Sequence, residues 1–268
     1  MISLGFSPCP NDTFIFYAMV NNRIDTNGLD FELHIEDVET LNRLAMAKAL
    51  DITKISCHAF QYLKDDYRFL RSGGAFGRGC GPLIVARESF EWKDLKGKSI
   101  AIPGALTTAY LLLRLFFDAA LDTKPSSIVP MPFHEIPAAV RDGRVDAGLI
   151  IHESRFTYPE YGLSKVIDMG EWWETETGLP IPLGGIIAKK SLGPKIEIIE
   201  TIIKKSVEYS IAHRKEAMPF IRDYSQELSE IVINNHIGLY VNDFTLDMGE
   251  EGIASLNELL RRAQTADR

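Results

Sequence analysis

Short apolar segments alternate along the chain with longer segments whose apolar residues recur at helical spacing. Residues 2–6 and 51–56 predict buried strands, and residues 31–35 alternate apolar and polar side chains as a half-buried strand does. Helices are predicted from about Phe14 and again beyond Val38. Strands and helices in this order predict an α/β fold with a mainly parallel sheet.

Polar residues lie where the predicted strands end. Ser7 and Asn11 follow the first strand, and Lys54 and Ser56 lie near the end of the third. In folds of this kind, ligands bind outside the carboxyl ends of the strands. We therefore expect these four residues to contribute to a binding site.

A glycine-rich run, residues 73–81, has the composition of a nucleotide-binding loop. Pro82 and a predicted strand at residues 83–86 follow it, whereas a phosphate-binding loop should open a helix. The alternative is a flexible crossover in which backbone passes close to backbone or ligand. Arg78, inside the run, is a candidate anion ligand or a solvated surface residue.

The pattern repeats in the middle of the chain. A predicted strand ends at Pro103, and an apolar helix runs from Ala105 to Phe117, so Thr107 and Thr108 lie where that helix begins. The first N–H groups of a helix lack internal partners and can bind a carboxylate. A threonine at this place either caps the helix or lies beside such a ligand.

A buried-looking strand at residues 148–151 leads directly to His152. Histidine is the side chain whose ordinary pKa lies closest to neutral pH, and poised histidines cluster at strand ends that face ligands. His152 is therefore either a structural residue or a general base. His58 also follows a strand. The remaining histidines are expected at the surface or in satisfied core positions, and they are His34, His134, His213 and His236.

The last third of the chain is predicted to be mostly helical. Residues 179–185 are its most linker-like stretch, and a turn at residues 241–245 precedes a final helix at residues 252–263. One apolar helix face is predicted to comprise Ile199, Ile202, Ile203, Val207 and Ile211.

Composition narrows the choice of partner. The 268 residues carry a formal net charge of −8 without a run rich in lysine and arginine, which argues against nucleic acid or an anionic membrane and favours a small molecule. The three cysteines form no CxxC pair, and the first residues do not resemble a secretion signal. Both observations predict a cytoplasmic protein.

Two stretches, DLKGKSIAIPGALTTAY and IPAAVRDGRVDAGLI, resemble the second lobe of type II periplasmic binding proteins. That resemblance implies two α/β lobes with a ligand cleft between them. The implied boundaries place residues 1–85 in lobe I, residues 86–181 in lobe II, and residues 182–268 in a return to lobe I with the C-terminal helices.

Longer strings, among them SPCPNDTFIFYA, RSGGAFGRGCGP and GLIIHESRFTY, resemble the 1,4-dihydroxy-6-naphthoate synthases of the futalosine route to menaquinone. The resemblance implies a lyase that acts on cyclic dehypoxanthine futalosine without a metal or redox cofactor. It implies that His152 is the proton acceptor. The implied substrate contacts are Lys54, Ile55, Ser56, Thr107, Thr108 and Ala109.

Two other classes of protein share this predicted fold. A non-catalytic bilobal binding protein or sensor would keep the cleft without performing a reaction, because a fold does not determine a function. The effector domain of a transcriptional regulator would be accompanied by a helix-turn-helix segment, for which the strand at residues 2–6 leaves no room.

Overall fold

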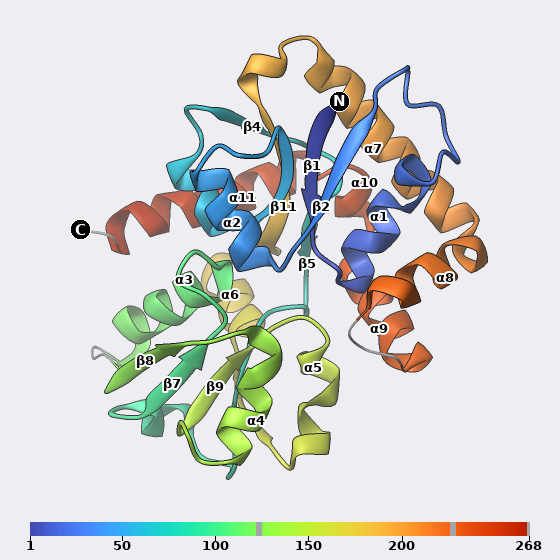
Figure 1. Ribbon diagram of the computed structural model, residues 1–268. Coiled ribbons are helices and arrows are strands. Elements are labelled where there is room, and N and C mark those ends of the chain that lie inside the picture. The colour runs from blue at the N-terminus through green and yellow to red at the C-terminus, as the bar shows by residue number, and fades with distance from the viewer. Residues whose placement is uncertain (122–124, 226–228, 267–268) are drawn as a thin grey trace.

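The computed structural model describes residues 1–121, 125–225 and 229–266. Residues 122–124 of the predicted 86–181 segment, and residues 226–228 and 267–268 of the predicted 182–268 segment, lie outside the described residues. Its described strands form two sheets, which lie in separate halves of the molecule (Figure 1). The chain passes from the first half to the second beyond β5 and returns in β11. No helix in the described part of the chain is long and apolar enough to span a membrane.

The first sheet has the strand order β2-β1-β3-β11-β4, with β5 paired to β11. β1 pairs in parallel with β2 and β3, whereas β11 is antiparallel to all three of its partners. Its strands are β1 (Ile2–Phe6), β2 (Phe31–Ile35), β3 (Ile52–Ser56), β4 (Tyr67–Phe69), β5 (Ala75–Gly77) and β11 (Ile181–Lys189).

The second sheet has the order β10-β6-β9-β7-β8. β7 is parallel to β8 and β9, and β6 is antiparallel to β9 and β10. Its strands are β6 (Leu83–Ala86), β7 (Ser99–Ile102), β8 (Ser127–Pro130), β9 (Ala147–Ile150) and β10 (Ser164–Asp168). The prediction of a mainly parallel sheet is therefore wrong, because each sheet is mixed.

Helices cover both sheets. The α-helices of the described residues are α1 (Pro10–Val20), α2 (Val38–Met46), α3 (Thr108–Phe116), α4 (Ile136–Arg141), α5 (Ser154–Thr157), α6 (Met169–Thr177), α7 (Lys195–Ala212), α8 (Arg214–Tyr224), α9 (Glu230–Tyr240), α10 (Asp243–Leu246) and α11 (Gly249–Ala266). Short helical turns include η1 (Cys57–Tyr62), η2 (Trp92–Leu95), η3 (Phe117–Leu121), η4 (Phe133–Glu135), η5 (Tyr158–Tyr161) and η6 (Lys190–Leu192).

Three local predictions are corrected by the structure. α1 begins at Pro10 rather than near Phe14, because a proline in the first turn lacks only an N–H that has no helical partner there. The linker-like stretch at residues 179–185 leads into β11, an interior strand of the first sheet. The side chain of Ile211 is exposed, although the rest of the predicted apolar face of α7 is buried.

Each half has its own hydrophobic core. In the first half, β1 and α1 pack against α7 around Phe6, Phe16 and Ile203. In the second half, α4 covers the face of β6 and β9 that includes Val85 and Ile150. All of β6 lies in the second sheet, so the first passage between the sheets occurs before Leu83.

Candidate active site

A cavity is lined by residues from both halves of the molecule. The lining residues are Ser7, Asn11, Asp12, Val38, Lys54, Ile55, Ser56, Ala75, Cys80, Pro82, Thr107, Thr108, Ala109, Ile151, His152, Leu183, Gly184 and Tyr240. Every site residue predicted from the sequence except Arg78 is among them.

A buried ion pair joins α1 to β3 on the first-half side of the cavity. Lys54 Nζ lies 2.9 Å from Asp12 Oδ1 and donates a hydrogen bond of 2.9 Å to the carbonyl of Gly73. Asp12 also accepts hydrogen bonds from the Ser7 hydroxyl and backbone N–H. Two buried charges are tolerated where each has its partner and additional hydrogen bonds. Lys54 therefore lines the cavity as one partner of an ion pair without net charge, and not as an uncompensated cation.

Asn11 connects this ion pair to α9. Its amide nitrogen donates to Asp12 Oδ1 over 2.9 Å, and its amide oxygen lies 2.9 Å from His236 Nε2. Since an amide oxygen only accepts, His236 carries its proton on Nε2 in this arrangement. Burial lowers the pKa of His236 well below its ordinary value, so the ring is neutral at pH 7.

His152 follows β9 and projects from the second half into the cavity. Its ring lies near that of Phe133, with centroids 5.0 Å apart, and near the almost parallel ring of His236, with centroids 6.2 Å apart. Its φ of 56° lies in the left-handed region, which is unusual for a residue with a Cβ and costs about 1–2 kcal/mol. Such strain is maintained only where the surrounding structure fixes it.

Burial lowers the pKa of His152 to about 4, because the charged imidazolium loses its hydration. Asp12 opposes this shift, and Lys54 adds to it. The ring is consequently neutral at pH 7 and has a free lone pair. A neutral imidazole on a cavity wall can accept a proton from a bound molecule.

α3 begins beside the same cavity. The Thr107 hydroxyl accepts a hydrogen bond from the Tyr110 N–H, so Thr107 is the N-cap, as one of the two sequence readings predicted. The Thr108 hydroxyl donates to the Leu183 carbonyl and accepts from the His58 N–H. Both hydroxyl groups thus form hydrogen bonds with other groups of the protein. The outward-directed N–H groups of the first turn are the donors that α3 offers to an anion.

Two residues singled out in the sequence lie apart from the cavity lining. Arg78 forms ion pairs with Glu251 and Glu174, at 2.7 and 3.8 Å, and donates to the Gly178 carbonyl. These contacts hold the side chain of Arg78 beside the end of α6. This position agrees with the interpretation of Arg78 as a surface residue and not with its interpretation as an anion ligand. His58 is buried in η1 beside Tyr62, with ring centroids 5.9 Å apart.

Sequence reasoning missed three residues that belong to this neighbourhood. His236 was expected to be an ordinary histidine, yet its ring lies against that of His152. Asp12 and Tyr240 also line the cavity, although neither was predicted as a site residue. His236 and Tyr240 are four residues apart and so share one face of α9. That spacing is visible in the sequence, but the packing of α9 against α1 is not.

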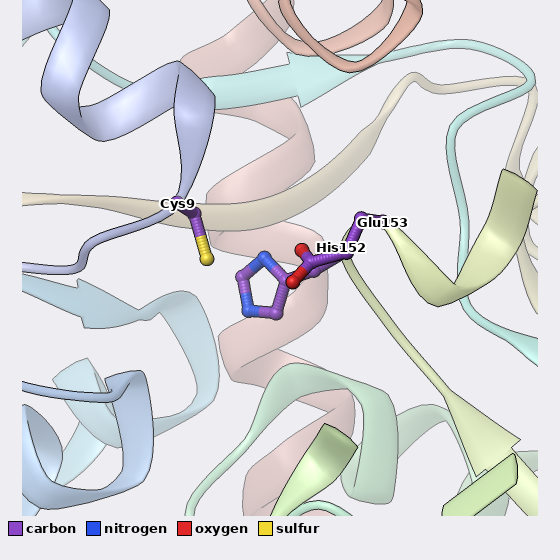
Figure 2. A group of neighbouring side chains, drawn as sticks. All are labelled: Cys9, His152 and Glu153. Atoms are coloured by element: carbon purple, nitrogen blue, oxygen red, sulfur yellow. The ribbon is translucent and has the colours of Figure 1, made fainter. Parts of the chain in front are cut away.

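Figure 2 shows a group of neighbouring side chains, Cys9, His152 and Glu153. Of these, His152 lines the cavity. One donor atom from each lies within 4.8 Å of the other two. Burial, together with the negative charges of Glu153 and Asp12, raises the pKa of the Cys9 thiol well above its usual range. Cys9 is consequently a neutral thiol beside a neutral imidazole and the side chain of Glu153.

Solved structures share this fold. A crystal structure of an Archaeoglobus fulgidus protein aligns with a TM-score of 0.91 at 38% identity, covering 99% of this chain and 97% of the other. The periplasmic aliphatic sulphonate binding protein of Escherichia coli aligns with a TM-score of 0.67 at 15% identity, covering 99% and 85% of the two chains. The predicted fold of the type II periplasmic binding proteins, with two α/β lobes, is thereby confirmed.

Comparison with curated proteins identifies closer relatives. A 1,4-dihydroxy-6-naphthoate synthase of Thermus thermophilus is 48% identical over 98% of this chain and 94% of its own. The Streptomyces coelicolor protein of the same name is 47% identical over 98% and 92% of the two chains. A family model described as menaquinone biosynthesis matches residues 2–265. The chain therefore belongs to the menaquinone biosynthesis family that includes these synthases.

Proposed function

We propose that this protein is a 1,4-dihydroxy-6-naphthoate synthase, a lyase of menaquinone biosynthesis whose substrate is cyclic dehypoxanthine futalosine. One observation carries the proposal beyond family membership. A neutral imidazole, His152, faces a cavity that also contains a helix start and a buried ion pair. These are the groups needed to take a proton from a bound carboxylate-bearing molecule.

His152 acts as the general base in this proposal. The substrate carries a ketone beside the spiro ring that bears the sugar. Removal of a proton next to this carbonyl forms an enolate, and the ring oxygen then leaves by β-elimination. Carbon–carbon cleavage and aromatisation complete the naphthoate. The left-handed backbone and the flanking rings of Phe133 and His236 fix the direction of the His152 lone pair.

The substrate carboxylate binds at the start of α3. Backbone N–H groups of Thr108 and Ala109 lie at the positive end of the helix dipole, and both residues line the cavity. Lys54 is already paired with Asp12, so it contributes less net positive charge than its ammonium alone suggests. Ile55, Ser56 and Asn11 complete the substrate contacts on the first-half side.

The cytoplasm is the proposed location. Cys9, Cys57 and Cys80 are all free and buried, as expected of thiols in a reducing compartment. The main rival function is that of a non-catalytic binding protein with the same fold. Such a protein needs no neutral base at its cavity wall, whereas His152 occupies a strained conformation there.

Turnover of the purified protein tests the proposal. Incubation with cyclic dehypoxanthine futalosine should yield 1,4-dihydroxy-6-naphthoate, followed by absorbance and identified by mass. The synthase of Thermus thermophilus provides the positive control. Binding of the substrate without conversion, under conditions in which the control enzyme converts it, would leave the binding-protein function in its place.

A further inference from the structure

The group formed by Cys9, His152 and Glu153 has the composition of a transition-metal site. Thiolate sulfur, imidazole nitrogen and carboxylate oxygen are the three ligand types that zinc takes from proteins. The donor atoms come from two segments, the N-terminal end of α1 and the turn after β9, and lie within 4.8 Å of one another. Two donors bound to one tetrahedral zinc ion lie roughly 3–4 Å apart, given bonds of about 2.0–2.3 Å. Side-chain rotations that move the donor atoms by about 1 Å therefore suffice to bring all three within bonding distance of one ion.

The charges of the group balance a divalent cation. As metal ligands, a cysteine thiolate and a glutamate carboxylate each contribute one negative charge, and a neutral imidazole contributes none. Binding of M²⁺ with loss of the thiol proton gives two negative ligands and one neutral ligand around the ion. The buried complex then has no net charge, which avoids the cost of leaving a charge uncompensated. The nearest other charges, Asp12 and Lys54, already neutralise each other.

The geometry also leaves a coordination position open. Only His152 of the three ligands lines the cavity, so a bound ion would have protein ligands on one side and the cavity on the other. Three protein ligands with a fourth position open to water or a small molecule is the arrangement that catalytic zinc sites have. Figure 2 shows the sulfur of Cys9 pointing toward the His152 ring, with the carboxylate of Glu153 beside it.

From these observations we infer that Cys9, His152 and Glu153 bind a zinc-class divalent cation. Coordination uses the lone pair of His152, so the metal-bound protein lacks a free base. If His152 is the base of the proposed reaction, zinc is an inhibitor of that reaction. This consequence rests on the proposed function, whereas metal binding itself does not.

Cobalt(II) titration of the purified protein tests the binding. The wild type should develop visible bands of tetrahedral cobalt and a near-ultraviolet band of thiolate-to-cobalt charge transfer, and added zinc should bleach both. Cys9→Ser should lose the charge-transfer band. Glu153→Gln should weaken binding by about 10-fold or more, since even indirect support of a ligand is worth that much. Cys57→Ser, which removes a buried thiol away from this group, is the matched control and should behave as the wild type.

Several results would overturn the inference. A charge-transfer band that persists in Cys9→Ser, or that disappears in Cys57→Ser, would assign the thiolate ligand elsewhere. A wild type without that band would show that no thiolate site forms. Far-ultraviolet circular dichroism establishes that each variant is folded, and unchanged cobalt affinity in folded Glu153→Gln would remove the carboxylate from the site. Activity plays no part in these readouts, so failure of the proposed function leaves them unaffected.

Discussion

Acidification should destabilise the folded protein through His152. The pKa of this ring is lowered from 6.5 to about 4 by burial. Between these two pH values the ring is therefore mostly protonated in the unfolded chain and mostly neutral in the folded chain. The folded state therefore loses free energy of unfolding as the pH falls from about 6.5 toward 4. Well above pH 6.5 both states are neutral at this residue, and the contribution no longer changes.

The magnitude follows from the two pKa values. At pH 5 the unfolded ring is almost fully protonated, whereas about one folded ring in ten is, and the difference corresponds to about 2 kcal/mol. His152→Asn removes this titration. Asparagine is also among the residues that best tolerate a φ of 56°, so the variant should keep the backbone of the turn.

Urea unfolding at pH 7 and pH 5 measures the effect. Between these two values the wild type should lose about 2 kcal/mol more free energy of unfolding than His152→Asn does. His34→Asn removes a half-buried histidine of β2 that does not line the cavity, and this variant should follow the wild type. If the wild type and His152→Asn lost equal stability on acidification, the ring would not be held neutral by burial and the reasoning would be refuted.

Three further predictions concern the cavity. Lys54→Met should lower the free energy of unfolding by about 3–5 kcal/mol, measured with urea, because the carboxylate of Asp12 stays buried without its cation; a loss below about 1 kcal/mol would mean that water replaces the ammonium group. Ala109→Leu should raise KM by about 10-fold or more with a smaller change in kcat, because the added side chain fills the space before the first turn of α3; an unchanged KM would place the substrate carboxylate elsewhere. Small-angle scattering should show a more compact protein when product binds between the lobes, and identical profiles at saturation would indicate a rigid cleft.

Local sequence patterns were sufficient to predict most strands and helices. Residues 2–6 and 31–35 are strands with the predicted bounds, and Thr107 caps its helix, which was one of the two predicted alternatives. The order of the strands in the two sheets could not be predicted from local patterns. Pairing partners of β11 are more than a hundred residues away in the chain, and its prolines and glycines resemble those of a loop. Antiparallel pairing of β11 made both the linker interpretation and the parallel-sheet prediction wrong.

The predicted site residues converge because strand ends meet at the cavity. Lys54 and His152 both lie at such ends, and the structure brings them to one cavity. His236 could not be recognised in the same way, because it lies within a helix and its role depends on how α9 packs against α1. The guanidinium group of Arg78 could bind an anionic ligand, but in the structure it forms ion pairs with Glu251 and Glu174. These glutamates are far from Arg78 in the sequence, so the ion pairs could not be predicted from it.

Turnover by His152→Asn is the most direct test of the central claim that His152 is the base of a naphthoate synthase. The variant should still bind cyclic dehypoxanthine futalosine while kcat falls by roughly 10²–10⁴-fold, the usual loss for a positioned general base. In the wild type, kcat/KM should decline only as the pH approaches about 4, where the ring gains its proton. Near-normal turnover by His152→Asn, with His58→Asn inactive instead, would contradict the account and leave His152 as a structural residue at the end of β9.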